Sequence, residues 1–310
     1  MTTVHGSSYR FIWFGLEMVS LFIHFTCLLP LLIGTPVTRA FMPRLNGATF
    51  LGPSNALSPV NVAHSRNRGI FCMRSNEMIT VEGVSVVLLA GGVGKRMKAD
   101  RPKQFIELLG KPVLLHSLEI FSTLPGVNRI VIVLDKSYRQ EFSFLQEEDP
   151  RIVFADPGKE RQDSVFNGFS QTLPDASVVC IHDSARPLVS QSAVLASLRD
   201  GSVHGAAVLG VPMKATVKES ADGEFVLRTM NRSRLWEIQT PQVIKPDILS
   251  EAFALVTEKG LEVTDDVSMV EQVGRPVKLT MGEYTNIKLT TPEDIGVAEG
   301  FLRERAEGKL

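Results

Sequence analysis

The sequence predicts a doubly wound α/β fold with a mostly parallel sheet, preceded by a leader of different composition. From about residue 82 onward, short runs rich in β-branched residues alternate with longer segments of helical periodicity, which is the pattern of such a sheet. The first of these runs ends in a cluster of glycines, as strands do where a ligand approaches the backbone. The leader lacks lysine altogether, since the first lysine of the 310 residues is Lys95.

The first 79 residues have the composition of a targeting segment. Phe11 to Ile33 is strongly apolar, and Val37-Thr38-Arg39-Ala40 then offers small residues at the −3 and −1 positions of a cleavage site. Residues 41–79 are rich in Ser, Asn and Arg, and Glu77 is their only acid. We therefore predict a signal peptide over about 1–40 and a transit peptide over about 41–79.

This bipartite leader resembles that of plastid proteins in algae with secondary plastids, and the resemblance implies a location in the chloroplast stroma. A permanent membrane anchor is the alternative. The uncharged part of the apolar segment, Met18 to Ile33, is short for a membrane span of about 20 residues. We therefore expect no permanent membrane insertion.

The remaining chain, residues 80–310, is predicted to be one domain in which strands and helices alternate. The predicted strands are 84–89, 129–134, 151–154, 178–182 and 206–211. The predicted helices are 113–123, 162–171, 192–199, 246–258, 266–273 and 292–307. In sheets of this kind ligands bind at the carboxyl ends of the strands, so we look for the site there.

One segment interrupts this alternation. Residues 216–219 and 224–229 flank Ser220-Ala221-Asp222-Gly223, and an Asp-Gly pair is a strong hairpin signal. We predict a β-arm over about 213–235 that stands off the sheet and provides an oligomer contact.

Charge and cysteine content exclude some functions. From residue 80 onward acidic residues outnumber basic ones, which is unfavourable for general nucleic-acid binding, so we expect no nucleic-acid partner. The cations must therefore be concentrated in a pocket. Cys180 is the only cysteine beyond residue 79, so the domain has no intrachain disulfide, and its apolar neighbours favour a buried core position.

The strongest motif is Leu88-Leu89-Ala90-Gly91-Gly92-Val93-Gly94-Lys95-Arg96-Met97, followed closely by Arg101-Pro102-Lys103-Gln104. The glycines expose backbone N–H groups to an anion, and Lys95, Arg96 and Lys103 place cations around it. A Walker A loop would need Ser or Thr where Arg96 stands, and a dinucleotide loop would need glycine in place of Met97. The pattern is typical of nucleotidyltransferases that activate sugars and alcohol phosphates; the alternative is an ordinary turn with a solvated basic face.

A second motif, Ile181-His182-Asp183-Ser184-Ala185-Arg186-Pro187, follows a predicted strand. Asp183 could hold Mg²⁺ or a substrate hydroxyl at the strand end, or could simply be a turn residue. Ser164 lies at a helix start, where it could bond a base or a phosphate, or only cap the helix. Five further segments are weak singly: Met213-Lys214-Ala215-Thr216-Val217-Lys218, Asn231-Arg232, Gln239-Thr240-Pro241-Gln242, Thr264-Asp265-Asp266 and Asn286-Ile287-Lys288-Leu289-Thr290.

In this order and spacing, the motifs make residues about 82–303 closely resemble the 2-C-methyl-D-erythritol 4-phosphate cytidylyltransferases, and most closely the plant plastid form. The segments Pro157-Gly158-Lys159-Glu160-Arg161-Gln162-Asp163-Ser164 and Thr285-Asn286-Ile287-Lys288 carry the resemblance together with the Asp183 motif. It implies a Rossmann-like nucleotidyltransferase sheet with a protruding β-arm. It also implies transfer of CMP from CTP to methylerythritol phosphate, giving 4-diphosphocytidyl-2-C-methyl-D-erythritol and pyrophosphate in non-mevalonate isoprenoid biosynthesis, with Mg²⁺ or another divalent cation.

The resemblance also implies roles for single residues and a homodimer whose arms reach the partner's site. Arg96 and Lys103 would stabilise the transition state, while Arg232 and Lys288 would position methylerythritol phosphate. The residues implied in substrate binding are Ala90, Gly91, Gly92, Lys95, Gly158, Ser164, Asp183, Ser184, Thr216, Thr240 and Thr264. Lys159 stands where bacterial enzymes often have Asp, so a contact between its side chain and the nucleotide stays open.

The chemistry itself supports this interpretation. Both reactants are anions, so the site must suppress their repulsion with cations. The attacking phosphate is already ionised near neutral pH, so no general base is needed, and His116, His182 and His204 are interpreted as structural. The alternatives are a sugar-phosphate nucleotidyltransferase, a ribitol-5-phosphate cytidylyltransferase, a nucleotide-binding oxidoreductase and a non-catalytic binding module.

Overall fold

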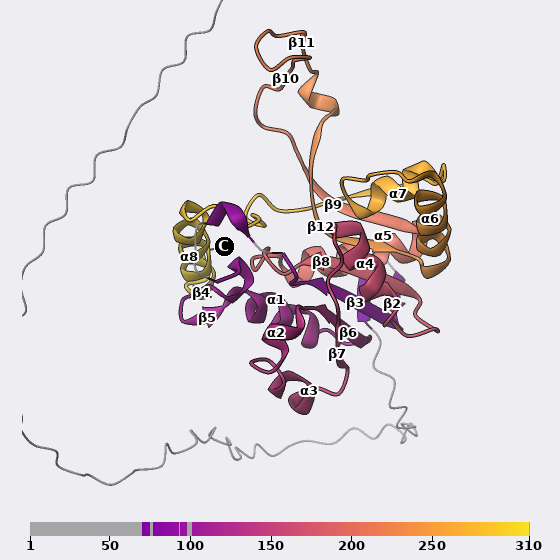
Figure 1. The fold of residues 1–310 in the computed structure, drawn as a ribbon, viewed down its shortest axis with the longest axis vertical. Coiled ribbons are helices and arrows are strands. Elements are labelled where there is room, and N and C mark those ends of the chain that lie inside the picture. The colour runs from indigo at the N-terminus through magenta and orange to yellow at the C-terminus, as the bar shows by residue number, and fades with distance from the viewer. Residues whose placement is uncertain (1–69, 75–76, 93, 98–100, 310) are drawn as a thin grey trace, which may run out of the picture. The chain divides into compact units, whose positions relative to one another are not determined.

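The computed structural model describes residues 70–74, 77–92, 94–97 and 101–309, and its centre is a sheet of seven strands (Figure 1). The strand order is β13-β9-β12-β8-β3-β6-β7. The bounds are β3 Val84–Leu89, β6 Val127–Val133, β7 Ile152–Ala155, β8 Val178–Asp183, β9 Ala206–Pro212, β12 Trp236–Ile244 and β13 Lys278–Met281. Within this sheet only β12 runs antiparallel, against both β8 and β9, so the predicted mostly parallel doubly wound sheet is confirmed.

Helices cover both faces of the sheet because successive strand residues point to opposite sides. Val86 and Leu88 of β3 pack in one core with α1 and α5, whereas Val87 between them packs in a second core with α4, α6 and α7. The helices are α1 Val113–Ser122, α2 Lys136–Arg139, α3 Phe144–Glu148, α4 Arg161–Phe169, α5 Gln191–His204, α6 Pro246–Lys259, α7 Asp266–Gln272 and α8 Glu293–Ala306. Short 3₁₀ turns occur at Lys95–Met97, Lys103–Phe105 and Arg232–Arg234.

A third, smaller core packs α8 against the segments that precede α1, follow β8 and follow β13. Leu108, Leu188 and Leu289 are buried there together with Ala298 of α8. The pair β4 Glu107–Leu108 and β5 Lys111–Pro112 forms a small antiparallel turn against this helix. Residues far apart in sequence are thus held by one hydrophobic cluster.

The sequence missed β12 and β13, for identifiable reasons. The middle of β12 reads Gln239-Thr240-Pro241-Gln242, which is polar and contains a proline, and its pairing with β9 is irregular between Ile238 and Gln242. β13 is short and forms the sheet edge, where Leu279 and Met281 are exposed. Neither strand shows the buried β-branched run by which the others were recognised.

An antiparallel hairpin of β1 Ile70–Arg74 and β2 Glu77–Val81 precedes the sheet and contacts α5. The described fold therefore begins before the predicted domain boundary at residue 80, within the segment interpreted as transit peptide. The rest of the predicted leader, residues 1–69, lies outside the described residues, so the cleavage sites stay predictions. Among the residues that the structure describes, no helix has the length and apolarity needed to span a membrane.

The predicted β-arm projects from the sheet between β9 and β12 (Figure 1). Its ladder is shorter than expected, since β10 Lys218–Glu219 pairs with β11 Arg228–Thr229 over two residue pairs only. The predicted hairpin is present, but its loop is longer than the Ser220–Gly223 segment expected: the side chain of Asp222 accepts bonds from the N–H groups of Glu224 and Phe225 and thereby stabilises this longer loop. Three apolar side chains near the tip are exposed, namely Phe225, Val226 and Leu227.

Candidate active site

A cavity of about 330 Å³ lies at the carboxyl ends of β3 and β8. It brings together eight of the residues singled out from the sequence: Gly91, Gly92, Lys103, Gly158, Ser164, Asp183, Ser184 and Lys288. Lys159, whose role the sequence left open, also lines it. Because Leu89 and Asp183 are paired at the ends of neighbouring parallel strands, the glycine loop and the Asp183 motif meet at one place.

Two glycines form one wall because the backbones of two loops pass very close to each other. A Cβ on Gly91 would lie 2.5 Å from Cβ of Pro157. A Cβ on Gly158 would lie 2.1 Å from Cβ of Asp163, on the first turn of α4. Neither position accepts a side chain without movement of the loop, so the wall offers bare backbone to a ligand.

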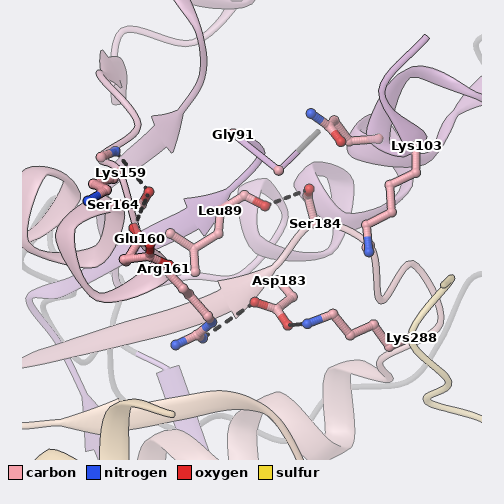
Figure 2. A pocket seen from close by; sticks show the side chains of 14 residues that line it. Leu89, Gly91, Lys103, Lys159, Glu160, Arg161, Ser164, Asp183, Ser184 and Lys288 are labelled. Carbon is pink, nitrogen blue, oxygen red and sulfur yellow. Dashed lines mark hydrogen bonds and ion pairs between the residues drawn. The ribbon is translucent and has the colours of Figure 1, made fainter. Parts of the chain in front are cut away.

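Polar side chains fix these loops rather than pointing freely into the cavity. Ser164 accepts a bond from the N–H of Gly158 at 2.9 Å and donates to the carbonyl of Glu160 at 3.1 Å. Ser184 donates to the carbonyl of Leu89 at 2.7 Å (Figure 2). Ala90 is buried, and its carbonyl accepts a bond from the buried side chain of Gln104. Through these bonds Ser164 and Ser184 hold the loops that line the cavity.

Asp183 lies between two cations on the floor of the cavity (Figure 2). Nζ of Lys288 donates to its Oδ2 at 2.6 Å, and Nη2 of Arg161 lies 3.4 Å from its Oδ1. Burial acts to raise the pKa of Asp183, but the charges of Arg161 and Lys288 prevail and hold this pKa below its usual range. Asp183 is thus a carboxylate at all working pH values.

Arg161 is held in turn by a buried carboxylate behind the cavity. Its two terminal nitrogens donate to both oxygens of Asp266, at 2.6 and 2.9 Å. This forked geometry fixes the guanidinium plane, so that one nitrogen remains directed toward Asp183. Arg161 and Asp266 both occur in the sequence motifs, but neither was predicted as a site residue. Their contact joins α4 to α7 across 105 residues, which no local motif reveals.

Lys103 approaches the same cluster from the segment after the glycine loop. Its ammonium donates to the carbonyl of Leu289 at 2.9 Å. Burial, followed by repulsion from Lys288, lowers the pKa of Lys103 to about 8, although Asp183 acts in the opposite direction. The site without substrate therefore carries an excess of positive charge, which is the condition for binding a polyanion.

A buried polar network supports the floor from below. The N–H of Asp183 donates to Oγ1 of Thr240 at 3.1 Å, and this hydroxyl also lies 3.1 Å from Nδ1 of His182. Burial lowers the pKa of His182 to about 4, so the ring is neutral and fits a structural role. The side chain of Asn286 donates to the carbonyl of Thr240, and the backbone carbonyl of Asn286 accepts a bond from Arg186. Thr240 therefore lies behind Asp183, outside the cavity wall.

The other predicted residues lie elsewhere. Arg96 is exposed on the turn after the glycine loop, near enough to Lys103 to repel it, and Thr264 is exposed before α7. The side chain of Lys95 lies outside the described residues. Thr216 and Arg232 are exposed on the β-arm and do not line this cavity.

The acidic residues that line the cavity are Glu160 and Asp183, so a metal ion there would be bound chiefly by a substrate. In the described part of the chain, no three His, Cys, Asp or Glu side chains gather in a metal-binding group. Asp183 reaches the cavity floor, and Mg²⁺ commonly takes one or two protein carboxylates together with phosphate oxygens. The residues therefore fit a phosphate-bound Mg²⁺ with Asp183 as a protein ligand.

Comparison with known proteins identifies the family of this chain. The family described as 2-C-methyl-D-erythritol 4-phosphate cytidylyltransferase matches residues 84–304. The chloroplastic enzyme of that name from Oryza sativa subsp. japonica is 48% identical over 259 residues, covering 82% of this chain and 87% of the relative. Its namesake from Pelotomaculum thermopropionicum is 40% identical, covering 74% of this chain and 98% of the relative.

Solved structures give the same result. The 4-diphosphocytidyl-2C-methyl-D-erythritol synthase of Anaerococcus prevotii superimposes with a TM-score of 0.65 at 30% identity, covering 72% of this chain and 96% of that one. The 2-C-methyl-D-erythritol 4-phosphate cytidylyltransferase of Thermus thermophilus gives a TM-score of 0.59 at 32% identity, covering 71% and 98%. Nearly the whole of each solved chain thus corresponds to the folded domain described above.

Proposed function

Because this chain belongs to the 2-C-methyl-D-erythritol 4-phosphate cytidylyltransferase family, we infer that it transfers CMP from CTP to methylerythritol phosphate in isoprenoid precursor biosynthesis. The products are 4-diphosphocytidyl-2-C-methyl-D-erythritol and pyrophosphate. The observation that carries the proposal is the cation cluster of Lys103, Lys288 and Arg161 around Asp183, facing a wall of bare glycine backbone. That wall suits a flat base and its phosphates, and the cluster suits two anionic reactants.

The residues act chiefly by charge and position. The phosphate oxygen of methylerythritol phosphate attacks the α-phosphorus of CTP, and the bond to the pyrophosphate oxygen breaks. Lys103 and Arg96 offset the negative charge that spreads over the α-phosphate oxygens in the transition state. Lys288, whose ammonium donates to Asp183, is proposed to orient the attacking phosphate. No side chain needs to remove a proton, and the neutral, buried His182 supports the floor only.

A divalent cation, Mg²⁺ or another, would complete the proposed site. When bound it supplies charge neutralisation of the triphosphate and of the leaving pyrophosphate. Asp183 would hold it on the protein side, and Lys288 would then be released toward the substrate phosphate. Ser184, next to this carboxylate, ties its backbone to Leu89, while the bond from Gln104 to Ala90 holds the start of the glycine loop.

We further propose a homodimer with shared sites. Arg232 and Thr216 lie on the arm, outside their own cavity, yet the family resemblance gives both a role at methylerythritol phosphate. A two-stranded ribbon of this length is marginal on its own, and the exposed Phe225, Val226 and Leu227 near its tip suit a protein contact. An arm that reaches a second copy would supply both the contact and the missing residues.

The mature protein is proposed to act in the plastid stroma. The rice relative is chloroplastic, and the leader composition of residues 1–79 supports import by signal peptide and transit peptide. CTP, methylerythritol phosphate and a second copy of the chain are the partners expected there.

The reaction is tested on the chain from residue 70 onward, with pyrophosphate release as the readout. Each of the four nucleoside triphosphates is offered with methylerythritol phosphate or ribitol phosphate. CTP with methylerythritol phosphate should turn over at least about 100-fold faster than any other pair, because pockets that hydrogen-bond their substrate discriminate strongly. Faster turnover with ribitol phosphate would replace this assignment by the rival one.

The shared site is tested by mixing two inactive variants. A Lys103→Ala subunit and an Arg232→Ala subunit are co-expressed with different tags, and the mixed dimer is isolated. One of its two sites then retains both residues, so about half of the wild-type activity per dimer should return. A mixed dimer without activity, or an active enzyme that sediments as a monomer, would exclude the shared-site arrangement.

A further inference from the structure

The β-arm cannot fix its own direction. Its ladder has two residue pairs, Lys218 with Thr229 and Glu219 with Arg228, and isolated ribbons of this size are marginal in water. Between the ladder and the sheet, the two connecting segments share few backbone hydrogen bonds. One of them runs from the N–H of Met213 to the carbonyl of Leu235, at 3.0 Å. A residue on the arm can therefore be delivered to a set place only if the base of the arm is held from outside.

The loop between β13 and α8 is a rigid support next to this base. The N–H of Gly282 donates to the carbonyl of Gly210 on β9 at 2.8 Å. The side chain of Gln239 on β12 donates to the carbonyl of Glu283 at 2.9 Å, and the buried Asn286 donates to Thr240. The loop is thus attached to both strands from which the arm arises.

Tyr284 connects this loop to the arm by two contacts. Its hydroxyl donates to the carbonyl of Pro212, the last residue of β9, at 2.7 Å. The ammonium of Lys214, two residues further along, lies 3.3 Å from the centre of the Tyr284 ring, which is a close cation–π contact. The carbonyl of Lys214 in turn accepts a bond from Nη1 of Arg232 at 3.0 Å. The contacts form a continuous series from the Tyr284 loop to the Arg232 guanidinium.

We propose that Tyr284 is a positioning residue for Arg232: it fixes the direction of the arm base, so that Arg232 reaches the partner subunit's site in a defined place. The inference rests on the proposed shared site. Tyr284 touches no reacting group itself, and its effect is expressed in the other subunit. The same loop carries Lys288 into its own subunit's cavity, so one segment contributes to two sites by different routes.

The test places Tyr284→Ala in either half of the mixed dimer. The first subunit carries Lys103→Ala and the second carries Arg232→Ala, so the one complete site combines Lys103 of the second with Arg232 of the first. Tyr284→Ala in the first subunit should lower kcat/KM for methylerythritol phosphate about 10-fold, since a hydrogen bond and a cation–π contact are lost. KM for CTP should change less than about twofold, because Arg232 positions the other substrate.

In the second subunit the same substitution should leave the complete site within about twofold of the parent, because that arm already lacks Arg232. Tyr284→Phe in the first subunit keeps the ring and should lose only about threefold. A loss that appears with the second subunit instead, an equal loss with both, or no loss with either would each overturn the inference. Absence of activity in the parent mixed dimer would instead refute the shared site, and this inference with it.

Discussion

The pKa of Lys103 predicts how activity falls at alkaline pH. Burial and the neighbouring Lys288 lower this pKa to about 8 from an ordinary value of 10.5. Transition-state stabilisation needs the ammonium form, because a neutral amine offers no charge to the α-phosphate. With a pKa of about 8, the charged fraction of Lys103 drops from about 0.9 at pH 7 to about 0.1 at pH 9. Thus kcat/KM for CTP should fall roughly 10-fold over this interval.

The measurement is kcat/KM for CTP between about pH 6.5 and 9.5, because this parameter reports ionisations of the free enzyme. Product is separated from CTP by chromatography, so that no coupling enzyme introduces a pH dependence of its own. In the complex, the triphosphate beside Lys103 raises its pKa, so the fall in kcat should begin at a higher pH than the fall in kcat/KM.

Lys103→Arg is the matched variant. Arg remains charged throughout this range, so its kcat/KM should stay level where the wild type declines, whatever its absolute activity. A wild-type kcat/KM that is flat to pH 9.5, or an identical decline in Lys103→Arg, would show that the ionisation of Lys103 does not govern activity.

Three further predictions concern the loops and the leader. Arg96→Ala should lower kcat by about 10²–10³. The control Arg101→Ala removes only a surface ion pair with Glu141 and should change kcat less than about twofold. Equal kcat values for the two variants would show that Arg96 does not stabilise the transition state. Gly158→Ala should lower the melting temperature by about 3–10 °C, because its Cβ would overlap Asp163, while Gly92→Ala, which meets no atom within 4 Å, should leave it unchanged; calorimetry of both decides. Mass spectrometry of the protein from its native cell should find no peptides from residues 11–33, and their presence in the mature protein would contradict cleavage of the leader.

The sequence predicted the parts of the fold whose local pattern agrees with their final environment. The buried strands β3, β6 and β8 are runs of Val, Ile and Leu, and they were found close to their observed bounds. β12 was missed because its middle is made of buried polar side chains: Thr240 accepts a bond from the N–H of Asp183, and Gln242 accepts bonds from the first N–H groups of α7. The positions that support the site are thus those where the local pattern misleads.

Local sequence patterns likewise predict only part of the site. The glycine loop and Asp183 carry strong local signals, so their convergence at one strand edge could be predicted. The contacts of Arg161 with Asp266, and of Lys103 with Leu289, join segments more than 100 residues apart, and no spacing rule encodes them. Arg232 and Thr216 were assigned by resemblance alone, because an exposed arm shows nothing of what it will contact.

The topology around β12 has an evolutionary consequence. β9 leaves the sheet at the edge where the glycine loop lies, and the chain returns through its antiparallel neighbour β12, so the excursion begins and ends at adjacent points of one rim. Residues can be added to or lost from such an excursion while the strand register stays fixed, because loop length changes stability only slowly. The length and tip of the arm are therefore free to diversify between lineages, whereas the two strands at its root are not. Changes at the tip of the arm would thus alter the proposed contact with a second copy without moving the floor of the cavity.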